Sequence, residues 1–270
     1  MPFIQTRGAT LFVTEVGSPD CPPILFSNSL GTTHRMWDAV VEELAAEFRC
    51  IRYDTCGHGA STRAQAPFDI ADLAADALAV LDNLGVRQAH FAGLSLGGMT
   101  GQALAIQYPD RLSSLTLMAT TAFMPPAQAW LDRAALVRRE GTSAIVEATL
   151  SRWFTPGFLT QNTAAVDPVA REFSANDAEG YAACCEAIAR MDLRTTITGI
   201  VTPTLVIAGQ QDPATPVAMS EALRDAVTGA ELVVLDPAAH LLAVERPSEV
   251  AHHLARHIRR NTSPFLKPTP

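Results

Sequence analysis

The sequence lacks a long hydrophobic run, since nowhere do about 18 apolar residues follow one another without interruption. Its first residues, MPFIQTRGATLFVTEVG, also lack the basic segment and apolar stretch of a secretion signal. These two absences argue against membrane spanning and against secretion. We therefore expect a cytoplasmic protein without a membrane partner.

Cysteine and positive charge are both in short supply. The five cysteines are scattered, two of them are adjacent, and no pair has the spacing of zinc ligands, which predicts reduced thiols and no metal site. Lysine and arginine number 20 against 28 aspartates and glutamates, so the net charge is −8. No nucleic-acid partner is expected for such an acidic chain, and any anionic ligand must be met by a local cation.

Short apolar runs alternate with segments of helical spacing over most of the chain. The pattern predicts strands at residues 3–5, 10–15, 23–27, 50–53, 89–93, 112–119, 204–209 and 231–235, and helices at residues 36–48, 70–84, 96–108, 216–227 and 248–259. Such alternation is typical of an α/β fold with a mostly parallel central sheet flanked by helices.

The alternation stops between residues 120 and 198, where alanine, charged residues and helical spacings dominate and no buried strand is evident. We interpret this segment as an inserted helical cap. The core domain would then comprise residues 1–119 and 199–260. Residues 261–270, NTSPFLKPTP, are expected to form a loosely ordered tail.

The candidate nucleophile is Ser95, in the segment GLSLG between a predicted strand and a predicted helix. The five-residue pattern alone is more often an ordinary helix start, but its position between strand and helix indicates a nucleophile elbow. A turn this sharp holds the serine in a strained backbone conformation. The helix N-terminus also directs unpaired N–H groups toward the reacting centre.

Two suitable partners follow in the chain order serine, acid, histidine. Asp212 comes directly after the predicted strand 204–209, and His240 lies in the loop after the next strand. An aspartate in a turn or a histidine in a loop is ordinary by itself, and it is the order and placement that favour catalysis. We predict that His240 removes the Ser95 proton and that Asp212 holds the histidine.

The second oxyanion donor is predicted in the loop after the strand 23–27, which reads SNSLGTTHRMW. We nominate the backbone amides of Leu30 and Leu96. The residue types Asn28, Ser29 and Gly31 are also common in plain turns, so the loop composition alone would not indicate a site.

With these residues in place, the chain resembles the α/β-hydrolase superfamily from its first strands to about Ile258. Within that superfamily it resembles the 3-oxoadipate enol-lactonases in the segments SNSLGTTHRMWD, RYDTCGHGAS, GLSLGGM, RWFTPGF, GYAACCEAIARMDLR and AGQQDPATP. Asn28-Ser29 is typical of that family, whereas Cys56 stands where the family usually has arginine. The resemblance implies an α/β-hydrolase fold and a serine hydrolase that opens a small carboxylated enol-lactone to 3-oxoadipate, in aromatic-compound catabolism, without cofactor or metal.

A carboxylated substrate requires a positive group in the pocket, preferably an arginine that can engage both oxygens. Trp130 and Arg133 lie three residues apart and would share a helix face, so a ring beside a cation could point into the cleft. Trp153 is a further candidate for lining it. The alternative is ordinary packing for the tryptophans and a solvated helix charge for Arg133.

Two other functions stay open. A different carboxylesterase, lactonase or cofactor-free perhydrolase could use the same three residues, because fold and triad do not choose the acyl group. A non-catalytic ligand receptor on the same scaffold is less favoured, because Ser95, Asp212 and His240 are all present.

Overall fold

The computed structural model describes residues 2–64 and 67–262. The strands are β1 (Phe3–Gln5), β2 (Thr10–Val16), β3 (Pro23–Ser27), β4 (Arg49–Tyr53), β5 (Ala89–Leu94), β6 (Leu112–Met118), β7 (Thr204–Gly209) and β8 (Glu231–Leu235). The α-helices are α1 (Asp38–Leu44), α2 (Ile70–Asn83), α3 (Leu96–Gln107), α4 (Ala127–Glu140), α5 (Val146–Trp153), α6 (Pro156–Gln161), α7 (Thr163–Ser174), α8 (Ala178–Arg190), α9 (Val217–Ala226), α10 (Leu242–Glu245) and α11 (Pro247–Asn261).

One sheet of eight strands forms the centre of the molecule, in the order β1-β2-β4-β3-β5-β6-β7-β8. The pairs β1/β2 and β2/β4 are antiparallel, and every other neighbouring pair is parallel. The mostly parallel sheet predicted from the sequence is thus confirmed.

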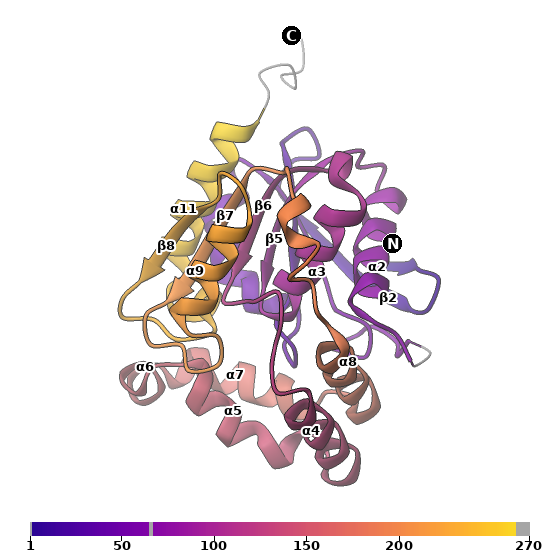
Figure 1. Ribbon diagram of the computed structural model, residues 1–270, viewed down its shortest axis with the longest axis vertical. Helices are drawn as coiled ribbons and strands as arrows, with labels where there is room; N and C mark the ends of the chain where they lie inside the picture. The colour runs from indigo at the N-terminus through magenta and orange to yellow at the C-terminus, as the bar shows by residue number, and fades with distance from the viewer. Residues whose placement is uncertain (1, 65–66, 263–270) are drawn as a thin grey trace.

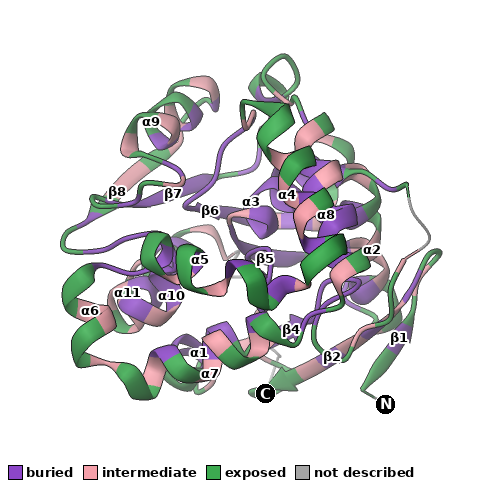
Figure 2. Ribbon diagram, turned by 90° about the horizontal axis from the view of Figure 1, so that it is seen from below, coloured by how far each residue is buried: buried purple, intermediate pink, exposed green. Residues whose placement is uncertain are grey.

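Helices cover both faces of the sheet. In Figure 2, α1 and α11 lie on one side of the strands, and α2, α3 and α9 lie on the other. The strands β5 and β7 are buried along their whole length as a result. A strand covered on both faces reads as a continuous apolar run, which is why these two segments are recognisable in the sequence.

Local signals set the ends of several helices. The Asp69 side chain accepts hydrogen bonds from the Ala71 and Asp72 amides, and the Asp72 side chain accepts one from the Asp69 amide, so a capping box starts α2. The helix predicted over residues 36–48 is wrong in extent. A 3₁₀ turn (His34–Trp37) precedes α1. The amides of Glu47 and Phe48 both donate hydrogen bonds to the Leu44 carbonyl, so the helix ends before residue 48.

Helices α4 to α8 are inserted between β6 and β7 and gather at one end of the sheet, below it in Figure 1. We keep the division into core and cap as a proposal and call α4–α8 the cap. The chain enters and leaves the cap side by side: Phe123 forms an antiparallel bridge with Asp192, and the Leu193 amide donates to the Ala122 carbonyl over 2.8 Å. We call these four residues the neck.

The C-terminal helix α11 runs to Asn261, two residues beyond its predicted end, and its C-terminal end lies at the end of the molecule opposite the cap in Figure 1. From residue 263 onward, the predicted tail lies outside the described residues. In the described part of the chain, no helix combines the length and apolar character needed to cross a membrane.

Candidate active site

Ser95 occupies the sharp turn between β5 and α3, with φ 56° and ψ −112°. A non-glycine residue at positive φ is strained, and such strain persists only where the surroundings enforce it. The turn leaves no space for side chains beside it. A Cβ atom at Gly93 would lie 2.2 Å from the Gly97 carbonyl oxygen, and one at Gly97 would lie 2.1 Å from the Ser27 carbonyl oxygen. Both glycines of the GLSLG segment are therefore required by close backbone approach.

Contacts with β6 and the residues after it fix this turn from the other side. The Ser95 amide donates to the Met118 carbonyl over 2.8 Å, and the Ser95 carbonyl accepts a hydrogen bond from the Thr120 hydroxyl over 2.8 Å. The serine backbone is thus tied to a buried neighbouring strand. Its position does not depend on the surrounding loops alone.

His240 and Asp212 form a buried pair at the ends of β8 and β7. The His240 Nδ1 atom lies 2.7 Å from Asp212 Oδ2. The amides of Ala214 and Thr215 donate to the other carboxylate oxygen over 2.7 and 3.0 Å, and the Thr215 hydroxyl donates to Oδ2 over 2.6 Å. Burial by itself would raise the pKa of Asp212, but the nearby His240 and the Thr215 hydrogen bonds outweigh it and lower that pKa below its usual value.

An ionised Asp212 fixes the orientation of the histidine. Its carboxylate can only accept, so His240 carries a proton on Nδ1 and keeps Nε2 as an acceptor. His240 and Ser95 both line one cavity of about 450 Å³. The structure therefore brings together three side chains that are far apart in the chain: two face the same cavity, and the third contacts the histidine.

The two nominated amides lie on adjacent segments. Gly97 donates its amide to the Asn28 carbonyl over 2.9 Å, which holds the start of α3 against the loop after β3. Within the described residues, no carbonyl or side chain accepts a hydrogen bond from the amide of Leu30 or of Leu96. Leu30 itself lines the cavity with Ser95. The arrangement leaves both N–H groups available to a ligand.

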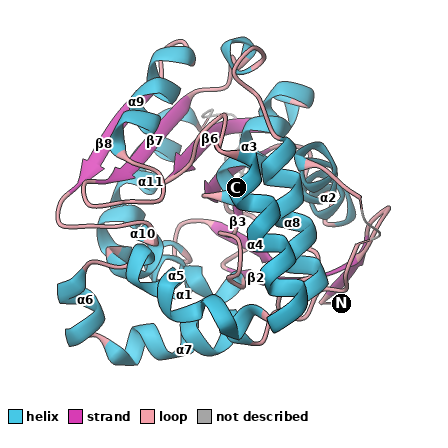
Figure 3. Ribbon diagram, turned by 60° about the horizontal axis from the view of Figure 1, so that its bottom comes forward, coloured by secondary structure: helices cyan, strands magenta, loops and turns pink. Residues whose placement is uncertain are grey.

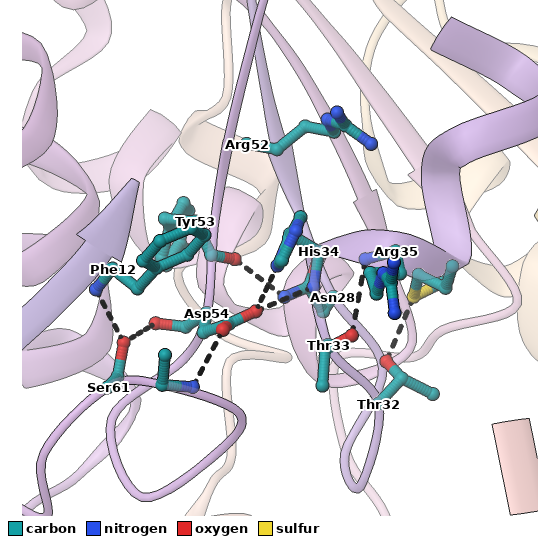
Figure 4. Close-up of polar contacts among 12 residues, drawn as sticks. Phe12, Asn28, Thr32, Thr33, His34, Arg35, Arg52, Tyr53, Asp54 and Ser61 are labelled. Atoms are coloured by element: carbon teal, nitrogen blue, oxygen red, sulfur yellow. Dashed lines mark hydrogen bonds and ion pairs between the residues drawn. The ribbon is translucent and has the colours of Figure 1, made fainter. Parts of the chain in front are cut away.

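Side chains hold the loop after β3 rigidly in place. The Asn28 amide group donates to the Tyr53 carbonyl over 2.6 Å, and the Asn28 oxygen accepts from the Trp37 indole over 2.9 Å. Figure 4 shows Asp54 at the centre of a further set of contacts, in which its Oδ1 atom accepts from the His34 amide over 2.7 Å and contacts His34 Nδ1 over 2.8 Å. The loop is thereby fixed to the end of β4.

His58 also holds the loop after β3 in place. The Gly31 amide donates to its Nε2 atom over 3.0 Å, so the ring proton is on Nδ1, which lies 3.1 Å from the Cys56 carbonyl oxygen. Burial lowers the pKa of His58, which keeps the ring neutral and able to accept. Cys56, the departure from the enol-lactonase pattern, is buried and is not among the described residues that line the cavity.

The cap supplies the opposite wall of the cavity. Trp130 and Arg133 on α4 and Trp153 at the end of α5, the three residues nominated for substrate binding, all line this cavity. Arg133 donates from Nε to the Tyr181 hydroxyl and from Nη2 to the Thr149 hydroxyl, both over 2.8 Å. Among the described residues, no aspartate or glutamate pairs with Arg133. Its charge is held in position but not neutralised.

The sequence prediction missed several lining residues, above all Arg152 and Tyr181. Arg152 directly precedes Trp153 but is exposed, and nothing in its spacing distinguishes it from other surface arginines. Tyr181 meets Arg133 across 48 residues of sequence, a contact that helical periodicity cannot predict. In the part of the chain that the structure describes, no three histidine, cysteine or acidic side chains are grouped as metal ligands.

Comparison with known proteins identifies several relatives of the chain. A family model described as the alpha/beta hydrolase fold matches residues 22–247. The 3-oxoadipate enol-lactonases 2 and 1 of Acinetobacter baylyi are 41% and 35% identical to the chain, over 95% and 90% of it and 96% and 91% of their own lengths. The crystal structure of an enol-lactonase from Burkholderia xenovorans LB400 superimposes with a TM-score of 0.93 at 37% identity, covering 96% of this chain and 100% of that one.

Proposed function

Because the chain belongs to the α/β-hydrolase family, and within it to the 3-oxoadipate enol-lactonases, it is a carboxylic ester hydrolase, and we propose that it opens 3-oxoadipate enol-lactone to 3-oxoadipate through an acyl-enzyme on Ser95. One observation carries this proposal. Ser95 and His240, the latter bound to Asp212, face the same cavity as Arg133, whose charge no carboxylate of the described residues neutralises.

The first half of the reaction forms the acyl-enzyme. His240 Nε2 takes the proton of the Ser95 hydroxyl as its oxygen attacks the lactone carbonyl. The carbonyl oxygen becomes negative and accepts hydrogen bonds from the amides of Leu30 and Leu96. When the tetrahedral intermediate collapses, the ring C–O bond breaks and the enol oxygen receives the proton from His240. Because the substrate is a ring, this leaving group stays attached to the acyl chain.

The second half releases the product. A water molecule gives its proton to His240 and attacks the ester carbonyl, and the same two amides receive the charge again. Collapse returns the proton to Ser95 and frees the acid, whose enol then becomes a ketone. Asp212 stays ionised throughout and stabilises the imidazolium formed in each half.

Stabilisation of the oxyanion by preorganised donors is usually the largest single contribution to the rate of such a reaction. In enzymes of this kind, loss of one such donor costs about 100- to 1000-fold in kcat, or roughly 3–4 kcal/mol. The strained backbone at Ser95 and the fixed loop at Asn28 support the role of these amides as oxyanion donors. Both features hold the backbone next to the amides, which must be directed at the same substrate oxygen.

Substrate choice depends on the cap wall. Arg133 is anchored by Tyr181 and Thr149, so it can engage a carboxylate without first losing rotamer freedom. The rings of Trp130 and Trp153 provide apolar walls for a small lactone. A small carboxylated lactone fits the combination of an apolar wall and one fixed cation, in a chain whose net charge is −8.

The test begins with a serine-directed phosphonate and intact mass measurement. We expect one adduct on the unchanged protein and on Ser143→Ala, an exposed serine of the cap, and none on Ser95→Ala. No adduct on the unchanged protein would refute the acyl-enzyme. Hydrolysis of the enol-lactone, followed by absorbance, is then compared with that of neutral aryl esters. A kcat/KM for the lactone no higher than for the esters would refute the substrate and favour a different ester hydrolase on the same residues.

A further inference from the structure

Glu245, the last residue of α10, is a buried carboxylate that the mechanism above does not use. The residue is only 7% exposed. Oε2 accepts the Ala239 amide over 2.8 Å, while Oε1 accepts both the amide and the hydroxyl of Thr155, over 3.0 and 2.5 Å. Ala239 immediately precedes His240, and Thr155 belongs to the cap segment between α5 and α6.

A second contact links the same two segments. The amide of Leu241, on the other side of His240, donates to the Trp153 carbonyl over 2.9 Å. Figures 2 and 3 both place α10 beside α5. The backbone after His240 is therefore bound directly to Trp153, and the backbone before it is linked to Thr155 through Glu245. Trp153 also lines the cavity.

We propose that Glu245 is a positioning residue for the hydrolysis proposed above: it fixes the His240 loop and the Trp153 wall of the cap in one geometry. Among the described residues, no arginine, lysine or histidine pairs with Glu245, so three hydrogen-bond donors alone compensate its buried carboxylate. Only an ionised carboxylate can accept from both segments at once without presenting a donor to either. Burying a carboxylate costs free energy unless hydrogen-bond donors compensate it, and here the donors come from the His240 loop and from the cap.

The isosteric variant Glu245→Gln tests the contact with the His240 loop separately from the contact with the cap. A glutamine side chain has one accepting oxygen, and an oxygen facing Thr155 keeps two of the three hydrogen bonds. Its NH₂ group then faces the Ala239 amide, so donor meets donor beside His240. Thr155→Val has the complementary effect, because it removes the hydroxyl contact with Glu245, together with the 3.3 Å hydrogen bond by which the same hydroxyl caps α6, and leaves the Ala239 contact intact.

The two variants should affect different kinetic constants. For Glu245→Gln we expect kcat to fall by about ten- to hundredfold, with KM within about twofold, because small displacements of a reacting group cost this much. For Thr155→Val we expect KM to rise by about fivefold, the value of one hydrogen bond, with kcat nearly unchanged. Thr155→Ser, which keeps the hydroxyl, should restore KM. Glu249→Gln, which removes a half-buried partner of Arg246 on the next helix, is the matched control and should change neither constant.

Several results would overturn the proposal. One is a Glu245→Gln protein whose kcat stays within twofold of the unchanged protein, and another is one whose kcat and KM change as in Thr155→Val. If Glu245→Gln does not fold, the Thr155 pair decides: equal KM in the valine and serine variants refutes the link. Phosphonate labelling of Ser95 is measured first. Absence of label defeats the proposed function, whereas a labelled protein in which Glu245→Gln matches Glu249→Gln defeats only the role of Glu245.

Discussion

Replacing Asp212 by asparagine should inactivate the enzyme without unfolding it. The asparagine oxygen is expected to keep the position of Oδ1, where it accepts the amides of Ala214 and Thr215. The NH₂ group must then replace Oδ2, 2.7 Å from His240 Nδ1. A donor at that place requires an acceptor on the ring, so the ring proton moves to Nε2, and the histidine can no longer take the proton of Ser95.

The same change in a serine protease triad lowers kcat by about 10⁴-fold, which corresponds to about 5 kcal/mol of transition-state stabilisation. We expect a loss of this order in Asp212→Asn for both lactone and aryl esters, and a matching loss in the rate of phosphonate labelling. Asp225→Asn, an exposed carboxylate on α9 that pairs with Arg224, is the control and should behave like the unchanged protein. A folded Asp212→Asn protein that keeps more than a tenth of the original kcat would refute the assignment.

Two further predictions concern charge. Arg133→Met should raise KM for the carboxylated lactone by about 10- to 100-fold, because a charge-assisted hydrogen bond is worth roughly 1.5–3 kcal/mol, and should leave KM for a neutral aryl ester unchanged. Arg139→Met, at an exposed position of the same helix, is the control. An equal rise in KM for both substrates would indicate lost packing and contradict the prediction. Burial and the neighbouring His257 lower the pKa of His90 to about 4, so the folded protein keeps this ring neutral. Below pH 6.5 the unfolded chain binds a proton at His90 and the folded protein does not, so the free energy of unfolding decreases by about 3 kcal/mol as the pH falls from 6.5 to 4. Chemical denaturation of His90→Gln should therefore show a flatter dependence of this free energy on pH. Identical slopes for the variant and the unchanged protein would contradict the prediction.

The sheet and the nucleophile turn were predictable because their signals are local. Strands β5 and β7 are covered on both faces, so they appear as unbroken apolar runs. The elbow needs glycine on both sides of Ser95 for steric reasons, and those glycines are readable in the sequence. The order of Ser95, Asp212 and His240 sufficed to nominate them, because parallel strands end at a common edge.

Contacts between distant side chains could not be predicted. The Glu245 carboxylate meets Thr155 across 90 residues, and α10 itself has only four residues, too short for a periodic pattern. The side chain of Thr215, which donates to Asp212, gives no signal in a turn where such residues are common. The early end of α1 depends on how the chain folds back to bury Phe48, which is a tertiary effect.

The neck has a consequence for how such enzymes acquire new substrates. Ala122 and Leu193 are neighbours in space, so a segment exchanged between them has its two ends together, and its replacement need not stretch or cross the sheet. Recombination at this junction could graft a foreign lid onto an unaltered catalytic scaffold. Such a chimaera would have one further requirement, since the graft must present hydrogen-bond donors to Glu245 where Thr155 does now.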